Sequence, residues 1–368
     1  MKVLHFYKTF FPETYGGVEQ VIDQLAQGMT KFGVKSQVLT ITKSKELTSG
    51  VVNGYPVHRS QSSLSVASTE FSIPAVRDFY KLAQEADIIH YQFPYPFADL
   101  LHFMTRVNKP TVVSYQSDIV KQKNLLRIYK PLMYRFLNSV DQIIATSDNY
   151  LNSSEVLQKY KHKTSIIPNA LNKESYPLID SKKIDYWKEK LGEKFYLFIG
   201  VPRYYKGLYS LLDAAKGAEY NVVLAGSGGI EQELKDYAKK NNINNVIFVG
   251  SVTEADKVAL LNLCLSVVLP SHLRSEAFGM VLLEGAMYSK PLISCEIGTG
   301  TTFINQNNVT GLVSKPNNPD NLRKVMDYLW NNPDKAKTMG DNAFDRFNEH
   351  FTMDKMAQDY FKIYQKLL

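Results

Sequence analysis

The strongest candidate for chemistry is a pair of carboxylates in the second half of the chain. Glu276 and Glu284 have seven residues between them, in the segment HLRSEAFGMVLLE. A helix starting near Phe278 leaves the N–H groups of Phe278, Gly279 and Met280 unpaired at its amino end, which binds anions. Glu276 in the entry loop can then bind sugar hydroxyls, and Glu284, roughly 1.5 turns into the helix, can bind a ribose. Taken alone, Glu276 is better explained by the helix dipole and Glu284 as a surface residue, but the combination with the glycine favours a ligand site.

Two cations on another loop suit the same kind of ligand. The loop GVPRYYKG follows a strand ending in Phe-Ile-Gly and carries Arg203 and Lys206 ahead of the next helix. A guanidinium grips two phosphate oxygens at once and an ammonium adds a point charge, so the pair suits a diphosphate. Two solvated surface charges are the alternative, and the position at a strand end favours the binding function.

Glycines mark two further loops at strand ends. Gly16 and Gly17 stand between the first strand and a helix expected to run to about residue 32. Adjacent glycines let a backbone pass close to a ligand, although a plain strand-to-helix turn explains them equally well. The run GSGG at 226–229 resembles half of a dinucleotide fingerprint, but Glu231 occupies the third glycine position. Because this run also follows a strand of the second half, we reject NAD binding.

Short β-branched runs alternate with helical patterns along the whole chain, which predicts an α/β fold with parallel sheets covered on both faces. Thirteen strands are expected, too many for one ordinary open sheet, so two Rossmann-like domains are predicted. The boundary is expected in the polar stretch 168–177, and two helices at about 334–349 and 354–367 end the chain. The expected strands are 2–7, 36–42, 55–60, 87–92, 111–116, 142–146, 165–168, 195–200, 221–225, 246–249, 266–269, 291–295 and 311–314.

The composition indicates a globular protein, since 44% of its 368 residues are hydrophobic. The net charge of +7 is concentrated in residues 1–170, which carry 19 Lys and Arg against 13 Asp and Glu. This bias suits an anionic partner, although charge alone is better explained by a solvated surface. Cys264 and Cys295 lie in apolar runs, which predicts buried free thiols and no zinc site. Without a signal-peptide pattern or a spanning apolar run, we expect a cytoplasmic protein, bound at most to a membrane surface.

Together these residues resemble the motifs of glycosyltransferase family 4, whose members have the GT-B fold. The resemblance covers nearly the whole chain and includes Gly16-Gly17-x-Glu19, the Arg203 and Lys206 pair, and the two glutamates with Pro-Ser before them and Phe-Gly between them. The stretches HYQFPYPFADLLH, SYQSDIVKQK, PRYYKGL and PSHLRSEAFGMVLLEGA are especially similar to bacterial O-antigen mannosyltransferases of this family. The GT-B fold implies two Rossmann-like domains facing each other across a cleft. These are residues 1–170, joined by a carboxyl-terminal helix at about 351–368, and residues 171–350.

The resemblance also implies the reaction. It implies transfer of a hexose, mannose from GDP-mannose, onto a polyprenyl-diphosphate-linked oligosaccharide in O-antigen and lipopolysaccharide synthesis, with retention of configuration and without a metal or other cofactor. GDP-rhamnose or another nucleotide sugar is the alternative donor. By analogy, Arg203 and Lys206 neutralise the departing diphosphate, which Gly17 approaches from the first domain. The remaining donor contacts implied are Glu276 to the sugar, Glu284 to the ribose, and the backbone of Gly250, Ser251 and Val252 around the base.

One position departs from the family. Relatives usually carry a histidine after the fifth strand that contacts the donor sugar, and this chain has Gln116 there. Gln116 can hydrogen-bond a sugar hydroxyl but cannot carry a proton or a positive charge. His90 and His102 are nearby, but His90 is predicted to be structural at a strand end and His102 to lie in an apolar helix. The rival hypotheses are a catalytically silent nucleotide-sugar scaffold, which Gln116 supports, and an epimerase or phosphorylase, which the Arg/Lys pair and the two glutamates oppose.

A basic, partly amphipathic helix is predicted around residues 121–136. It is a candidate site for anionic lipid or for a lipid-diphosphate-linked acceptor. An ordinary helix with its apolar stripe in the core is the alternative, and it explains the apolar residues slightly better. No RNA- or DNA-binding motif appears, so nucleic acid is not an expected partner. The cations are Lys121, Lys123, Arg127, Lys130 and Arg135, interleaved with Leu125, Leu126, Tyr129, Met133 and Phe136.

Overall fold

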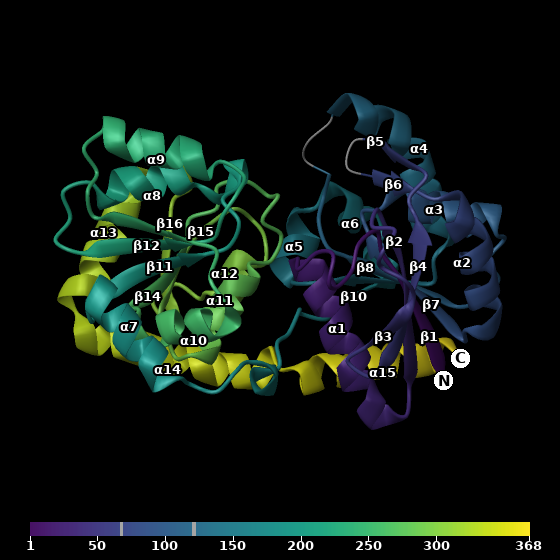
Figure 1. Ribbon diagram of the computed structural model, residues 1–368. Helices are drawn as coiled ribbons and strands as arrows, with labels where there is room; N and C mark the ends of the chain where they lie inside the picture. Colours follow the sequence, from purple (N-terminus) through teal and green to yellow (C-terminus); the bar gives the residue numbers. More distant parts are fainter. Residues whose placement is uncertain (67–68, 120–122) are drawn as a thin grey trace. The chain divides into compact units, whose positions relative to one another are not determined.

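The computed structural model describes residues 1–66, 69–119 and 123–368. The chain divides into two compact units: unit 1 is Met1–Ala170 with Met353–Leu368, and unit 2 is Leu171–Thr352. Each unit has one main sheet, eight-stranded in unit 1 and six-stranded in unit 2 (Figure 1). All thirteen expected strands are present, and their ends differ from the predicted ones by at most two residues. The prediction of an α/β fold is therefore confirmed.

The unit 1 sheet has the strand order β10-β9-β8-β7-β1-β2-β4-β3. Its strands are β1 Lys2–Phe6, β2 Lys35–Thr42, β3 Gly50–Val52, β4 Tyr55–Gln61, β7 Ile88–Phe93, β8 Thr111–Tyr115, β9 Gln142–Ala145 and β10 Thr164–Ile166, and β5 Leu64–Val66 pairs separately with β6 Thr69–Phe71. Its helices are α1 Gly17–Met29, α2 Ile73–Glu85, α3 Pro96–Met104, α4 Lys123–Ser139, α5 Asp148–Ser153, α6 Glu155–Lys159 and the returning α15 Met353–Leu367.

The unit 2 sheet has the strand order β13-β12-β11-β14-β15-β16. Its strands are β11 Phe195–Ile199, β12 Asn221–Ala225, β13 Val246–Gly250, β14 Ser266–Leu269, β15 Leu292–Cys295 and β16 Gly311–Ser314. Its helices are α7 Ser181–Leu191, α8 Leu208–Ala215, α9 Glu231–Lys240, α10 Glu254–Leu263, α11 Met280–Met287, α12 Thr301–Ile304, α13 Pro319–Asn331 and α14 Pro333–His350. Short 3₁₀ turns occupy Thr30–Phe32, Lys161–Lys163, Lys173–Ser175 and Tyr204–Lys206.

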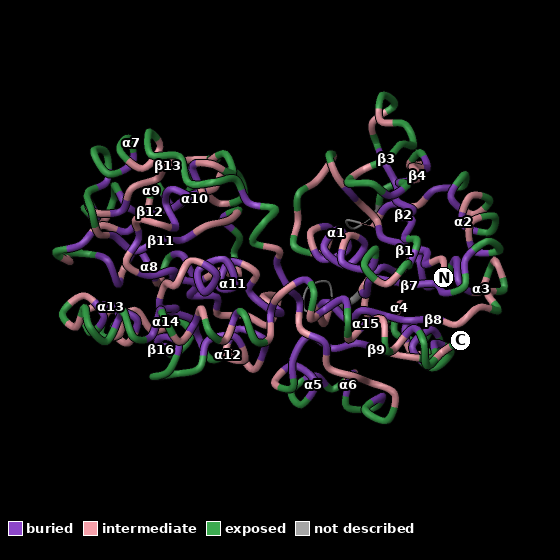
Figure 2. Tube along the Cα trace, turned by 90° about the horizontal axis from the view of Figure 1, so that it is seen from below, coloured by how far each residue is buried: buried purple, intermediate pink, exposed green. Residues whose placement is uncertain are grey.

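Helices cover both faces of each sheet. In unit 1, α15 covers one face, because Tyr360 and Tyr364 contact the ring of His90. α2 covers the other face, where Phe79 packs 5.3 Å from the ring of Phe6. In unit 2, α8 and α9 lie on one face and α10 and α11 on the other (Figure 1). The strands between these layers are buried almost throughout, as the purple trace of β7 and β8 shows (Figure 2).

Both sheets are parallel except at one edge of unit 1, where β3 pairs antiparallel with β4. β3, β5 and β6 are additional to the predicted strands, and each has only three residues. Such short segments contain too few positions to show a period-2 pattern in the sequence, which is why they escape prediction.

Each sheet has one switch point, where the strand order reverses and ligands of such folds bind at the carboxyl ends of the strands. In unit 1 it lies between β1 and β7, and in unit 2 between β11 and β14. The loops predicted to bind a ligand follow β1, β11 and β14. Their sequence positions therefore correspond to the binding edge of each unit's own sheet.

A buried hydrogen-bond chain joins α15 to the unit 1 sheet. Tyr364 Oη lies 2.8 Å from His90 Nδ1, His90 Nε2 lies 2.8 Å from Ser114 Oγ, and Ser114 Oγ lies 2.6 Å from Tyr360 Oη. All four side chains are buried. The predicted structural role of His90 is confirmed, although the residue lies inside β7 and not at its end. The predicted buried thiols Cys264 and Cys295 are also confirmed.

Replacing His5 with leucine should raise the free energy of unfolding and weaken its dependence on pH. His5 is fully buried in β1, and within the described residues neither ring nitrogen has a hydrogen-bond partner. Burial lowers the pKa of His5 to about 3. Because an unfolded histidine titrates near 6.5, the unfolded chain alone binds a proton between these values, and stability falls as the pH falls. By pH 5 this single group removes about 2 kcal/mol.

Urea unfolding at pH 7.5 and pH 5 measures this effect. The exposed His162 provides the matched control, since His162→Leu removes a histidine of the same unit without changing a buried site. An unchanged pH dependence in His5→Leu would show that His5 does not account for the acid sensitivity.

Candidate functional site

The loops that carry the predicted cations and the predicted carboxylate are in direct contact at the carboxyl edge of the unit 2 sheet. They follow β11 and β14, which are neighbouring strands. The N–H of His272 donates to the carbonyl oxygen of Tyr205 at 2.9 Å and joins the two loops. A Cβ on Gly207, whose φ is 69°, would lie 2.0 Å from the carbonyl oxygen of Pro270. The close approach of the two loops therefore requires glycine at this position.

Glu276 is half-buried between β14 and α11 and is held by a neighbouring hydroxyl. The buried Ser271 Oγ donates to Glu276 Oε2 at 3.2 Å. Tyr205 lies close to two of the predicted residues. Burial raises the pKa of Tyr205, the negative charge of Glu276 raises it further, and the positive charge of Arg203 opposes both. Glu276 and Arg203 thus both lie near the phenol of Tyr205.

Arg203 and Lys206 have different surroundings on the same loop. Arg203 is exposed at the start of the 3₁₀ turn, and its guanidinium makes no hydrogen bond or ion pair with the described residues. Lys206 bends back toward the end of β11. Its Nζ lies 5.4 Å from the centre of the Phe198 ring and 2.9 Å from where a Cβ on Gly200 would stand. Both cations therefore border the binding edge, where an anion can reach them.

α11 begins two residues later than predicted. Gly279 caps the helix with a φ of 95°, a left-handed conformation that favours glycine, so the first helical residue is Met280 and not Phe278. Phe278 is buried and Met280 is half-buried. A Cβ on Gly279 would lie 2.9 Å from Leu269 Cδ2, so the strand packs against the cap. Glu284 consequently lies about one turn into the helix, closer to its amino end than predicted.

Glu284 is buried, which rules out the interpretation as a surface residue. It is 7% exposed, and its Oε1 accepts hydrogen bonds from Lys257 Nζ at 2.8 Å and from Tyr176 Oη at 2.9 Å. Burial opposes the charge of Lys257, but Glu284 and Glu254 outweigh it and raise the pKa of Lys257. Both hydrogen bonds go to Oε1, and within the described residues Oε2 has no partner. One carboxylate oxygen is thus left for a ligand.

The predicted base-flanking backbone follows β13. Gly250 ends the strand with a φ of 71°, Ser251 is exposed and Val252 is half-buried. The N–H of Gly226 donates to the carbonyl oxygen of Gly250 at 2.8 Å. A Cβ on Gly226 would lie 2.2 Å from the carbonyl oxygen of Gly200. The loops after β13, β12, β11 and β14 therefore contact one another in sequence along the edge of the sheet.

The first glycine loop lies at the switch point of unit 1. Gly16 caps α1, and the exposed Gly17 is its first residue. Glu19 is buried, and its Oε1 accepts hydrogen bonds from Thr9 Oγ1 at 2.7 Å and Thr14 Oγ1 at 2.6 Å. A Cβ on Gly16 would lie 2.4 Å from Glu19 Oε2. Glu19 thus fixes the loop from inside, and its carboxylate packs closely against Gly16.

Gln116 also lies at the carboxyl edge of the unit 1 sheet. It follows β8 directly and is 9% exposed. Its Nε2 donates to Gln92 Oε1 at 2.8 Å. Three predicted site residues, Gly16, Gly17 and Gln116, therefore belong to unit 1, and the other ten belong to unit 2. Within each unit, the predicted residues gather at the carboxyl edge of that unit's sheet.

The predicted basic helix is α4. Lys121 lies outside the described residues, and the described side chains of α4 begin at Leu125. Met133 and Phe136 are buried, as the core interpretation predicts, whereas Leu125 and Ile128 are 46% and 79% exposed. In the described part of the chain, no helix has the length and apolar character needed to cross a membrane. There too, no three His, Cys, Asp or Glu side chains are grouped as metal ligands.

Several residues of the site are missing from the sequence prediction. Lys257 and Tyr176 bind Glu284, Ser271 binds Glu276, and Gln92 binds Gln116. Ser271 belongs to the Pro-Ser pair that precedes Glu276, so a local motif could have predicted its contact with Glu276. The other three partners lie 27, 108 and 24 residues from the groups they bind, and no local pattern links them.

Two family models match the chain, "Glycosyltransferase Family 4" over residues 15–175 and "Glycosyl transferases group 1" over residues 180–346. D-rhamnosyltransferase WbpZ of Pseudomonas aeruginosa is 50% identical over 352 residues, which cover 96% of this chain and 92% of that protein. O-antigen chain mannosyltransferase C of Escherichia coli is 47% identical over 368 residues, which cover 100% of this chain and 99% of that protein.

Solved structures share the fold over the full length. Sucrose-phosphate synthase from Thermosynechococcus elongatus has a TM-score of 0.84 at 18% identity, covering 100% of this chain and 98% of that one. Anabaena Alr3699/HepE, solved in complex with UDP-glucose, has a TM-score of 0.78 at 18% identity and covers 100% of both chains. At this identity the likeness shows the fold alone, and the predicted GT-B fold is confirmed.

Proposed function

The chain belongs to glycosyltransferase family 4, and we propose that it transfers mannose from GDP-mannose to a polyprenyl-diphosphate-linked oligosaccharide in O-antigen and lipopolysaccharide synthesis. The family predicted from the motifs is confirmed, and the chain is an enzyme, a glycosyltransferase. Retention of the anomeric configuration and independence from metals and cofactors are part of the proposal. The proposed location is the cytoplasm, with contact at the inner face of the cytoplasmic membrane.

The Escherichia coli relative supports GDP-mannose as the donor, and the Pseudomonas aeruginosa relative indicates the alternative. The relative named for O-antigen mannosyl transfer matches the chain from end to end, which supports mannose and an O-antigen acceptor. The relative named a D-rhamnosyltransferase is similarly close, so GDP-D-rhamnose is the first alternative donor. Both sugars are hexoses carried by a nucleotide.

One observation carries the proposal: the loop with Arg203 and Lys206 is hydrogen-bonded to the loop with Glu276 at a switch point. In the reaction, the bond between the anomeric carbon and the phosphate oxygen breaks and its electron pair leaves with the diphosphate. An acceptor hydroxyl oxygen bonds to the anomeric carbon, and its proton passes to an oxygen of the departing diphosphate. Arg203 and Lys206 stabilise the departing charge, which is the main demand of an oxocarbenium-like transition state. Glu276, oriented by Ser271, holds hydroxyls of the donor sugar.

The remaining predicted residues bind the rest of the donor in this proposal. Glu284 Oε2 accepts from the ribose, Gly17 lies near the diphosphate, and the backbone of residues 250–252 borders the base. Phe278, Gly279 and Met280 shape the amino end of α11 beside the sugar. Gln116 acts by hydrogen bonding alone, since an amide has no proton to transfer at neutral pH.

Sugar transfer by the purified full chain tests this function. We expect product from GDP-mannose and a synthetic polyprenyl-diphosphate-linked acceptor, and little from GDP-D-rhamnose or UDP-glucose. NMR of the product should show the anomeric configuration of the donor. Glu276→Ala should lower kcat by about 10³-fold, because it removes a group that orients the sugar at the reacting carbon.

The outcomes separate the hypotheses. Preference for GDP-D-rhamnose would replace the donor and leave the reaction class intact. Nucleotide binding without product, with turnover appearing in Gln116→His, would support the silent scaffold. Inversion of configuration, or full activity in Glu276→Ala, would contradict the proposed site.

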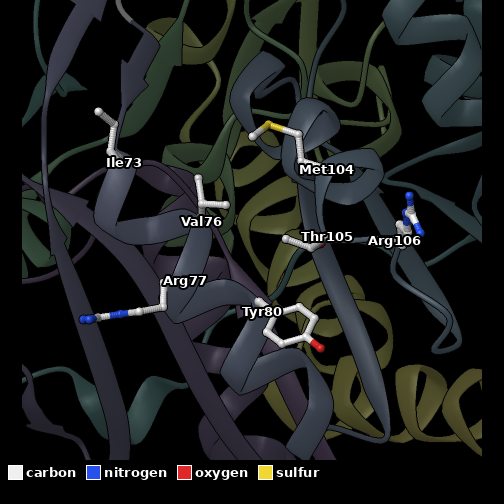
Figure 3. A pocket seen from close by; sticks show the side chains of 7 residues that line it. All are labelled: Ile73, Val76, Arg77, Tyr80, Met104, Thr105 and Arg106. Carbon is white, nitrogen blue, oxygen red and sulfur yellow. The ribbon is translucent and has the colours of Figure 1, made fainter.

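Membrane contact through unit 1 is a second part of the proposal, supported by exposed apolar and basic side chains on α2, α3 and α4. Arg127 and Lys130 are exposed on α4 beside Ile128, which is 79% exposed. α3 packs against both α2 and α4. A hollow between α2 and α3 is lined by apolar side chains with an arginine on either side (Figure 3). Its lining residues are Ile73, Val76, Arg77, Tyr80, Met104, Thr105 and Arg106. Apolar groups framed by cations suit an anionic lipid surface.

We expect the chain to sediment with phosphatidylglycerol vesicles at low salt and to be released by about 0.5 M salt, which screens such contacts. Arg127→Glu with Lys130→Glu should weaken this binding. Lys239→Glu with Lys240→Glu, two exposed cations of α9 in unit 2, is the matched control for net charge. Equal sedimentation with phosphatidylcholine vesicles would remove the membrane hypothesis.

A further inference from the structure

Three buried amides meet at the carboxyl edge of the unit 1 sheet. Gln92 is the second-last residue of β7, Gln116 follows β8, and Asn169 follows β10. Gln116 Nε2 donates to Gln92 Oε1 at 2.8 Å, and Asn169 Nδ2 lies 3.5 Å from Gln116 Oε1. Gln92 is 1% exposed, Gln116 is 9% exposed and Asn169 is 6% exposed. The orientation of the Gln116 amide is thus set by an acceptor on one side and a donor on the other.

Two polar groups in this region lack a partner. Gln92 Nε2 and Thr146 Oγ1 are buried and make no hydrogen bond within the described part of the chain. Tyr115 pairs with Ala145 in the parallel ladder, so Gln116 and Thr146 leave neighbouring strands at the same level and on the same face. An unpaired buried donor is costly, and proteins usually keep one only where water or a ligand satisfies it. Gln92, on β7, and Thr146, directly after β9, therefore flank Gln116 on its two sides.

The neutral amide and hydroxyl groups of the cluster indicate which class of ligand it binds. Every hydrogen bond that these four side chains make within the described residues joins one amide to another. A phosphate or carboxylate is better matched by Arg, Lys or a helix amino end than by neutral amides. A hydroxyl group accepts from an amide N–H through its oxygen and donates through its O–H to an amide or hydroxyl oxygen. Sugar hydroxyls are the class of group that satisfies the unpaired atoms.

We propose that Gln92 is a positioning residue that fixes the amide of Gln116, and that Gln92, Gln116 and Thr146 form a neutral subsite for hydroxyls of the transferred sugar. The inference rests on the proposed function, because it takes Gln116 to be part of the sugar site. Gln92 has two roles in it. Its Oε1 holds Gln116, and its Nε2 donates to the sugar directly. A site built to hydrogen-bond a hydroxyl discriminates strongly when one of its groups is lost.

A mutant cycle with Gln92→Met, Gln116→Met and the double variant tests the proposal. Methionine keeps the length of glutamine and removes both polar atoms. We expect each single variant to lower kcat/KM for GDP-mannose by about 10²-fold. The kcat/KM of the double variant should lie within about threefold of that of the less active single variant, because the two residues act as one unit. Affinity for GDP alone should stay within about twofold of wild type, since GDP lacks the sugar.

Gln37→Met is the matched control. Gln37 is also a buried glutamine of a parallel strand with an unpartnered Nε2, but it pairs with Leu4 in the first half of β2, away from the carboxyl edge. We expect it to keep wild-type kcat/KM. Equal losses in Gln92→Met and Gln37→Met, or single losses that multiply in the double variant, would overturn the proposal.

The mutant cycle can distinguish failure of the proposed subsite from failure of the proposed donor. If the wild type uses GDP-D-rhamnose or UDP-glucose, the donor assignment fails, and the same cycle measured with the sugar actually used still decides the subsite. Thermal unfolding of the four proteins without any donor provides a second readout of the contact. The sum of the stability losses in Gln92→Met and Gln116→Met should exceed the loss in the double variant. Strictly additive losses would show that the two side chains are not coupled.

Discussion

Arg203→Gln combined with Lys206→Met should lower kcat for sugar transfer by about 10⁴-fold or more. Each substitution keeps the aliphatic base of the side chain and removes a positive charge from the loop after β11. Removing one preorganised group that stabilises transition-state charge costs about 10²–10³ in rate, and here two such groups are lost at the same leaving group. The measurement is single-turnover transfer from GDP-mannose at saturating donor, so that weaker binding does not hide the effect on chemistry.

The control for this pair is Lys239→Met with Lys240→Met. These exposed cations also belong to unit 2 but lie at the end of α9. The control should transfer at the wild-type rate and unfold at the wild-type temperature. A rate within tenfold of wild type for the Arg203 and Lys206 double variant would mean that some other group neutralises the diphosphate.

Lys257→Met should destabilise the protein by about 3–5 kcal/mol, the largest effect on stability that we expect. The side chains of Lys257 and Glu284 are 13% and 9% exposed, and the ammonium lies 2.8 Å from Glu284 Oε1. Among the described residues, removing the cation leaves a buried carboxylate whose remaining partner is the hydroxyl of Tyr176. Urea unfolding of the full chain measures the loss.

Two further variants test whether the loss of stability comes from the unpaired buried charge. Lys257→Met with Glu284→Gln should recover most of the stability, because no buried charge remains unpaired. Lys337→Met breaks an exposed pair with Asp341 on α14, whose side chains are 76% and 54% exposed, and should change stability by less than about 1 kcal/mol. If the double variant is as unstable as Lys257→Met, packing of the lysine and not its charge is the cause.

The same pair predicts a dependence on alkaline pH. Burial opposes the charge of Lys257, but the two glutamates outweigh it and hold the pKa of Lys257 above its usual value. A raised pKa in the folded state gives stability that is complete below the unfolded value, near 10.4, and is lost as the pH rises through the folded value. On the alkaline side, the difference in the free energy of unfolding between wild type and Lys257→Met should therefore begin to narrow above about pH 10.4.

Much of the fold follows from local sequence. Runs such as 221–225 and 266–269 are rich in apolar, β-branched residues and bounded by turn residues, a pattern that favours a buried strand. The start of α11 shows the limit of such arguments. Packing of β14 against the cap gives Gly279 a left-handed conformation, which delays the helix to Met280. A local pattern contains no information about that contact.

Local sequence predicts the types of chemistry: cations at 203 and 206, carboxylates at 276 and 284, and an amide at 116, each beside a strand end. Those assignments depend on neighbours along the chain, which the sequence contains. The groups that support them are visible only in the folded chain, namely Lys257 and Tyr176 beside Glu284 and Gln92 beside Gln116. Gln92 reaches Gln116 because β7 and β8 are neighbouring strands, whereas Lys257 reaches Glu284 from α10 and Tyr176 reaches it from the segment after the 3₁₀ turn at 173–175. Each contact joins residues that are far apart in the chain.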